Sequence, residues 1–186
     1  MVNQNVAKGK VLISDPFLWD SNFERSVVYL VEHNEEGSLG LVLNYPLEET
    51  LNSKIKAKVG IASDFYQGGP VELNTLHFLH QNDTLQDAEK IQEGVYWGGN
   101  LNQAIETLDL LPHLKNEYKF FLGYSGWAAG QLQEELQENT WIVSDIHQDF
   151  IFGKTLESQA FWSAMMKKQE SDWRLLSNAP KHYFLN

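Results

Sequence analysis

The fold is decided by residues 120–136, FFLGYSGWAAGQLQEEL, because the hydrophobic period changes within this stretch. Its first residues are aromatic and apolar, as in a buried strand. Leu132 and Leu136 near its end are four residues apart with polar residues between them, which is the spacing of an amphipathic helix. Between the two patterns lie three glycines: Gly123, Gly126 and Gly130. The stretch therefore predicts a strand, a glycine-rich turn running from Gly123 to Gln131, and a helix.

The predicted turn departs from the known catalytic and nucleotide-binding motifs. A nucleophile elbow has glycine two residues after its serine, but Trp127 occupies that place after Ser125. A phosphate-binding loop continues into lysine, whereas Gln131 follows Gly130. The remaining ligand hypothesis is a small anion or carboxylate at the helix N-terminus, where the helix dipole contributes about 0.3–1 kcal/mol. We therefore assign no catalytic residue.

A structural role for Trp127 competes with these functional interpretations. An indole that buries ~150–250 Å² at ~25 cal/mol per Å² stabilises a fold by roughly 4–6 kcal/mol. This free energy is several times larger than the contribution of the helix dipole. We therefore expect Trp127 to plug the junction between the strand and the helix.

The composition indicates one folded domain that spans residues 1–186. The chain is 42% hydrophobic and 12% aromatic, and its formal net charge of −11 creates a field that repels phosphate backbones. Without cysteine there is no disulfide and no thiol-ligated metal site. His77 and His80 are three residues apart in a predicted strand and therefore point to opposite sides. No metal site and no cofactor are predicted.

The sequence carries no targeting signal. The N-terminus is polar, unlike a signal peptide, and no run approaches the ~20 apolar residues of a membrane span. The expected location is therefore cytoplasmic, without a membrane partner.

Strand signals dominate the first part of the chain and helix signals the later part. Apolar runs at 25–32 and 39–44 flank a polar segment, which predicts an antiparallel hairpin with Gly37 in its loop. Strands are also predicted at 11–13, 75–80 and 141–143, and helices at 48–59, 101–110 with Asn100 as N-cap, and 156–168. This order predicts an α+β fold, a single compact domain with a mixed, largely antiparallel sheet and flanking helices.

Several blocks of sequence occur in the order of a known family. They are GKVLIS at 9–14, RSVVYL at 25–30, GLVLN at 40–44, GGPV at 68–71 and FLGYSGW at 121–127. With these blocks the chain resembles the YqgE/AlgH family of bacterial proteins. The resemblance implies a small mixed α and β protein without an established activity. Ser125 stands where the family usually has alanine, which argues against a nucleophile.

Four residues are candidates for ligand binding: Arg25, Glu32, Trp127 and Gln131. Strict alternation along the predicted strand 25–32 places Arg25 on one face and Glu32 on the other. A buried arginine needs an anionic partner, which could be Asp20, Glu135 or a ligand. We expect a structural ion pair for Arg25.

Two classes of function remain open at this point. The first is a non-enzymatic interaction or regulatory protein whose acidic surface contacts a protein partner. The second is a small-molecule binder, or an enzyme, that uses the turn from Gly123 to Gln131. Some members of the resembled family are labelled transcriptional regulators, but the sequence offers no basic recognition helix for DNA.

The charge leads to a first prediction: the purified protein should not bind duplex DNA specifically at physiological salt. The reason is that a net charge of −11 repels the phosphate backbone, on which protein–DNA affinity largely depends. A mobility-shift titration with and without scrambled competitor measures this. A salt-tolerant shift with one sequence alone would refute the prediction and support a DNA-binding regulator.

Overall fold

A computed structural model describes residues 5–153, 158–169 and 171–179. The strands are β1 (Val11–Ser14), β2 (Val27–Asn34), β3 (Gly37–Val42), β4 (Phe65–Gln67), β5 (Val71–His80), β6 (Glu89–Gln92), β7 (Val95–Trp97), β8 (Tyr118–Ala128) and β9 (Trp141–Ser144). The helices are α1 (Glu49–Val59), α2 (Leu101–Leu110), the 3-10 helix η1 (Pro112–Glu117), α3 (Gln131–Gln137), α4 (Gln148–Phe152), α5 (Ser158–Lys167) and α6 (Ser171–Leu176).

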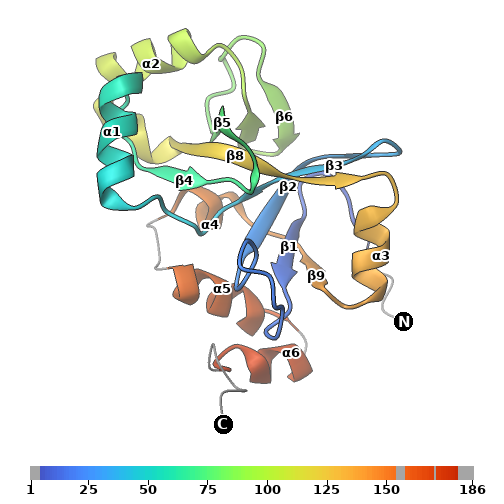
Figure 1. The fold of residues 1–186 in the computed structure, drawn as a ribbon. Helices are drawn as coiled ribbons and strands as arrows, with labels where there is room; N and C mark the ends of the chain where they lie inside the picture. The colour runs from blue at the N-terminus through green and yellow to red at the C-terminus, as the bar shows by residue number, and fades with distance from the viewer. Residues whose placement is uncertain (1–4, 154–157, 170, 180–186) are drawn as a thin grey trace.

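Strand β8 is the centre of one nine-stranded sheet, which Figure 1 shows crossing the molecule between groups of helices. The strand order is β6-β7-β5-β8-β3-β2-β1-β9, and β4 pairs with β8 beside this path. The β4–β8 pair is parallel and the other pairs are antiparallel. The predicted α+β fold with a mixed, largely antiparallel sheet and flanking helices is therefore confirmed.

The glycine-rich segment of β8 differs from the prediction. The strand continues through Gly126 and Trp127 to Ala128, so only Ala129 and Gly130 form a turn before α3. The predicted turn from Gly123 to Gln131 was wrong over residues 123–128. The reason is a remote partner, because β3 pairs with residues 125–128 and gives their backbone groups a hydrogen-bonded ladder.

Two backbones cross in contact near the middle of β8. A Cβ on Gly69 would lie 2.3 Å from the carbonyl carbon of Tyr124, and one on Gly123 would lie 2.7 Å from the carbonyl oxygen of Val71. Gly123 also has a φ of +67°, which favours glycine. These glycines let residues 68–69 pass across β8, so that β4 pairs with one of its edges and β5 with the other.

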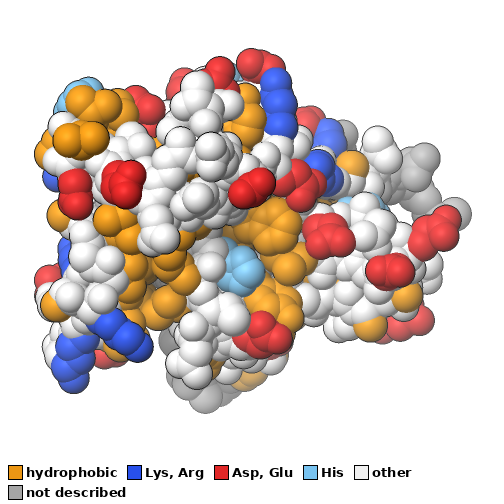
Figure 2. All heavy atoms as spheres, turned by 90° about the horizontal axis from the view of Figure 1, so that it is seen from above, with side chains coloured by type: hydrophobic (Ala, Val, Ile, Leu, Met, Phe, Trp, Pro, Cys, Tyr) orange, Lys and Arg blue, Asp and Glu red, His pale blue; other side chains and the backbone are white. Residues whose placement is uncertain are grey.

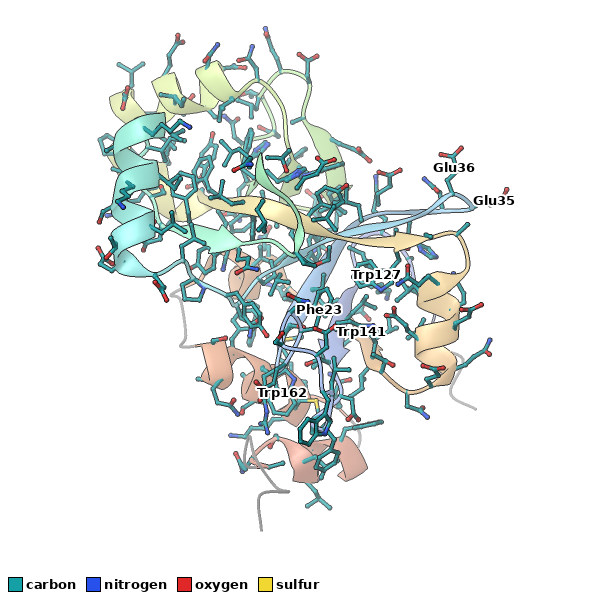
Figure 3. The ribbon with its side chains drawn as sticks, in the orientation of Figure 1. Phe23, Glu35, Glu36, Trp127, Trp141 and Trp162 are labelled. Atoms are coloured by element: carbon teal, nitrogen blue, oxygen red, sulfur yellow. The ribbon has the colours of Figure 1, made fainter. Side chains whose placement is uncertain are left out.

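The predicted hairpin is confirmed with one change in its loop. Strands β2 and β3 pair antiparallel, and Gly37 pairs with Asn34 as the first residue of β3. The loop therefore consists of Glu35 and Glu36, which lie at the tip of the hairpin in Figure 3. The backbone of Gly37, with a φ of +145°, leads out of the turn into the ladder.

The helices pack on three clusters of buried side chains. Helices α1 and α2 cover the cluster that contains Phe120, and α5 covers the one that contains Phe121. The Asn100 side chain caps α2 by accepting a hydrogen bond from the Gln103 amide at 3.1 Å, as predicted. The helix predicted at 156–168 is present from Ser158 to Lys167, and its first predicted residues lie outside the described part of the chain.

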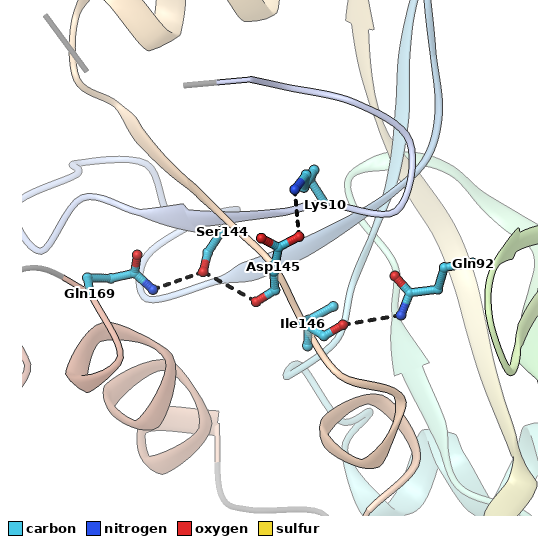
Figure 4. Close-up of polar contacts among 6 residues, drawn as sticks. All are labelled: Lys10, Gln92, Ser144, Asp145, Ile146 and Gln169. Carbon is cyan, nitrogen blue, oxygen red and sulfur yellow. Dashed lines mark hydrogen bonds and ion pairs between the residues drawn. The ribbon is translucent and has the colours of Figure 1, made fainter. Parts of the chain in front are cut away.

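Polar contacts hold the segment between β9 and α4 against its neighbours (Figure 4). They are Lys10 Nζ to Asp145 Oδ1 at 2.5 Å, Gln92 Nε2 to the Ile146 carbonyl at 3.2 Å and Gln169 Nε2 to Ser144 Oγ at 3.0 Å. Contacts from three different parts of the chain therefore position α4.

Trp127 fills the junction between β8, β3 and α3. Only 5% of its surface is exposed, and its ring stacks on Phe23 and meets Trp141 edge-on, with centroids 6.2 Å and 5.9 Å away. Its Nε1 donates a hydrogen bond to Glu135 at 2.8 Å. Gly40 leaves space for the indole, because a Cβ there would lie 3.4 Å from its ring. Figure 3 shows the three aromatic rings gathered beside α3.

This packing predicts that Trp127→Ala will lower the free energy of unfolding by roughly 3–5 kcal/mol, the usual cost of deleting a buried tryptophan. Urea unfolding followed by far-UV circular dichroism measures the change without relying on the lost fluorophore.

The matched control is Trp19→Ala, because Trp19 is 83% exposed. Its free energy of unfolding should change by about 0.5 kcal/mol or less. A loss below about 1 kcal/mol in Trp127→Ala would contradict the structural role of this residue.

Candidate functional site

A groove of about 300 Å³ runs beside the tip of the β2–β3 hairpin. The residues that line it include Glu32, Asn34, Glu36, Leu39, Tyr124 and Trp127. We call this feature the acidic groove. Two of the four predicted site residues, Glu32 and Trp127, line it, although the Trp127 ring packs on the opposite face of the sheet, and Gln131 and Arg25 are not among its lining residues.

A β-bulge places Glu32 in the acidic groove. The pairing of β2 with β3 shifts between Leu30 and Glu32, so Val31 is an extra residue without its own partner. Glu32 then lies opposite Leu39 and shares its face of the sheet. Strict alternation had placed Glu32 on the face of Leu30. The bulge corrects that expectation, because one inserted residue turns the following side chains to the other face.

The carboxylates of the acidic groove have no basic partner among the described residues. One oxygen of Glu32 accepts a hydrogen bond from Asn34 Nδ2 at 2.8 Å, and Asn34 Oδ1 accepts one from the Glu36 amide at 2.8 Å. These bonds order the hairpin tip. Neither Glu32 nor Glu36 forms a salt bridge with a lysine or arginine in the described ranges. A cation in the groove would therefore meet uncompensated negative charge.

Aromatic rings form the other wall of the acidic groove and continue beyond it. Tyr124 lines the groove and meets His77 edge-on at 5.6 Å, and His77 stacks on Trp97 at 6.1 Å. Burial lowers the pKa of His77, so its ring is neutral at neutral pH. Figure 2 shows a hollow on one face of the molecule in which a histidine lies among hydrophobic side chains, with acidic side chains around them.

Gln131 and Glu135 connect β8 to α3 instead of facing a ligand. Gln131 accepts a hydrogen bond from the Ala128 amide and donates one to Glu135, both at 3.0 Å. The second oxygen of Glu135 accepts from the indole N–H groups of Trp127 at 2.8 Å and Trp141 at 2.7 Å. Sequence reasoning missed this arrangement, because nothing in the local spacing shows that both indoles reach one carboxylate.

Arg25 lies at the opposite end of β2 and is 2% exposed. Its guanidinium carbon is 4.4 Å from the centroid of the Trp162 ring, and its Nη2 donates a hydrogen bond to the Ala179 carbonyl at 2.7 Å. The part of the chain that the structure describes contains no salt bridge to Arg25. The predicted ion pair stays a prediction: within the described residues, an aromatic face and a backbone carbonyl are the partners of the guanidinium.

Ser125 and His80 are buried and make contacts within the core of the protein. Ser125 is fully buried in β8, where its hydroxyl donates a hydrogen bond to the Gly68 carbonyl at 3.1 Å. His80 is fully buried between Tyr96 and Tyr118 and contacts the Gly98 carbonyl at 3.0 Å. A search of the described residues finds no group of three or more histidine, cysteine, aspartate or glutamate side chains arranged for a metal ion.

None of the helices in the described ranges combines the length and the hydrophobicity needed to cross a bilayer.

Comparisons with known proteins agree on one family. The model of the AlgH-like family matches residues 11–174. A UPF0301 protein from Cytophaga hutchinsonii is 40% identical over 178 residues, which cover 94% of this chain and 96% of the relative. A UPF0301 protein from Chlorobium limicola is 37% identical over 189 residues, and the match covers 100% of this chain and 100% of the relative.

Two solved structures resemble this one. The solution structure of the AlgH protein from Pseudomonas aeruginosa has a TM-score of 0.68 at 29% identity, and the match covers 93% of this chain and 94% of that one. A crystal structure from Corynebacterium diphtheriae shares the fold with a TM-score of 0.78 at 21% identity, over 95% and 94% of the two chains. The chain belongs to the AlgH-like family.

Proposed function

We propose that this protein is a non-enzymatic interaction or regulatory protein whose acidic groove binds a cationic segment of a protein partner. The observation that carries the proposal is the pair of carboxylates, Glu32 and Glu36, that face the groove without a basic partner in the described residues. A lysine or arginine side chain would supply the missing positive charge through charge-assisted hydrogen bonds.

The aromatic wall of the acidic groove favours the same class of ligand. A cation held over a tyrosine or tryptophan face gains about 0.5–2 kcal/mol, depending on how far it is desolvated. Tyr124 offers such a ring, whereas the Trp127 ring is buried on the opposite face of the sheet with Phe23 and Trp141. The methylene groups of a lysine or arginine would pack on Leu39, which also lines the groove.

A macromolecular partner fits the surroundings of the acidic groove better than an isolated cation. The groove is open and continues into the aromatic contacts of His77 and Trp97, which a longer segment could cover. The net charge of −11 attracts a basic partner from a distance and raises the rate of encounter. The same charge repels nucleic acid, so a regulatory role would act through protein contacts.

A peptide titration tests this function. The probe is a capped hexapeptide of alternating arginine and leucine, and the control peptide has glutamate in place of arginine. We expect saturable binding of the arginine peptide alone, with shifts of the Ser38, Tyr124 and Gly126 amides in two-dimensional NMR spectra. The affinity should fall as salt is raised, because screening weakens contacts between exposed charges.

The double variant Glu32→Gln with Glu36→Gln should weaken this binding by about tenfold, which corresponds to about 1.4 kcal/mol. The control is Glu106→Gln together with Glu138→Gln, which removes the same charge from exposed positions outside the groove. An equal loss in both double variants would show general charge attraction, and would refute a specific site in the acidic groove.

A further inference from the structure

A second hollow lies near the start of β8, away from the acidic groove. This cavity has a volume of about 450 Å³. Its walls come from the segment before β4, from β4 and β8, from η1 and from the end of α4. The side chains and backbone that matter are those of Ser63, Tyr66, Lys115, Lys119, Ile151 and Gly153. A volume of this size suits a small metabolite.

Lys119 is the buried charge of this cavity. It is 7% exposed, its Nζ lies 4.0 Å from the centroid of the Tyr66 ring, and the Phe161 ring centroid is 5.9 Å away. The Ile151 carbonyl is a distant hydrogen-bond acceptor at 3.5 Å. None of the described carboxylates forms a salt bridge with Lys119. A buried ammonium group without an anion is unfavourable, and burial lowers the pKa of Lys119 to about 7.

The other ionisable groups around the cavity add no uncompensated negative charge to it. Asp64 lines the cavity, but its carboxylate pairs with Lys56 at 2.7 Å and accepts a hydrogen bond from Asn52 at 3.0 Å. These contacts lower the pKa of Asp64 and compensate its charge. Tyr118 is neutral near pH 7, because burial raises the pKa of its hydroxyl. Lys115 adds a positive charge at the exposed rim.

We propose that this cavity binds a small oxyanion, the carboxylate or phosphate group of a metabolite, with Lys119 as its buried anchor and Lys115 at its rim. The anion would provide the counter-charge that the described residues do not provide. The Ser63 hydroxyl, which lines the same cavity, can donate a hydrogen bond that orients the anion. This site is separate from the acidic groove and takes a ligand of the opposite charge.

The proposal has a consequence for proton binding. Burial lowers the pKa of Lys119 to about 7, so near this pH both the neutral and the protonated amine are populated. An anion binds the protonated form and raises this pKa, so binding should take up protons from the solution at that pH. Above pH 7 the protonated fraction falls, and the apparent affinity for the anion should fall with it.

Isothermal titration calorimetry measures both effects. The probes are sulfate, which stands for a phosphate group and keeps its charge near neutral pH, and oxalate, which stands for a carboxylate. Each is titrated in two buffers with different ionisation enthalpies, so that the difference in heat gives the number of protons taken up. We expect one saturable site for at least one probe, and its identity distinguishes a phosphate ligand from a carboxylate ligand.

The variant Lys119→Met keeps an unbranched side chain that is one atom shorter and removes the amine. It should weaken anion binding by about tenfold or more and abolish the proton uptake. The control is Lys54→Met, which removes an exposed lysine outside the cavity and should change the affinity by about twofold at most. Unchanged binding in Lys119→Met, or no saturation of the wild-type protein by either probe up to about 50 mM, would overturn the proposal.

A measurement on the wild-type protein covers the case in which Lys119→Met does not fold. The Nζ and Cε resonances of isotope-labelled lysines are followed against pH with and without sulfate and oxalate. The pKa of Lys119 should rise when the bound anion is present, while the resonances of Lys54 should not respond to the probes. An unchanged pKa of Lys119 at saturating concentrations of both probes would overturn the proposal.

Discussion

The arrangement of the sheet depends on one steric constraint, the contact between two backbones where residues 68–69 cross β8. Side chains at Gly69 or Gly123 would occupy space that the opposite backbone already fills. The crossing lets β4 pair with the first part of β8 and leaves the same edge free for β3 further along. One strand thereby carries both candidate sites, with Lys119 near its start and Tyr124 beyond the crossing.

Arg25 and Lys119 are both buried and both cationic, but their surroundings suit them to different roles. Arg25 and Lys119 each lie over an aromatic ring and near a backbone carbonyl. The carbonyl is 2.7 Å from a guanidinium nitrogen of Arg25 but 3.5 Å from the amine of Lys119. Arginine keeps its charge in such surroundings, whereas lysine can lose its proton. This difference favours a structural role for Arg25, and it underlies the anion site that we propose at Lys119.

Local patterns predicted most of the elements, and remote contacts explain the rest. The hairpin of β2 and β3 and the Asn100 cap follow from short-range rules. The extension of β8 to Ala128 depends on pairing with β3, which no local pattern reveals. Of the residues that line the acidic groove, the sequence pointed to Glu32 and Trp127 as candidates, but it revealed neither the bulge at Val31 nor the position of Tyr124. The sequence does contain a signal for Lys119, because it is a single charged residue within an otherwise aromatic and apolar strand.

The central position of β8 also affects how the protein is made. Strands β3 and β5 leave the ribosome long before β8, yet each uses β8 as a sheet neighbour. Until β8 has been synthesised, the nascent chain carries unpaired strand edges, which can pair with other chains. Translation must therefore pass the last residues of β8 before these edges close.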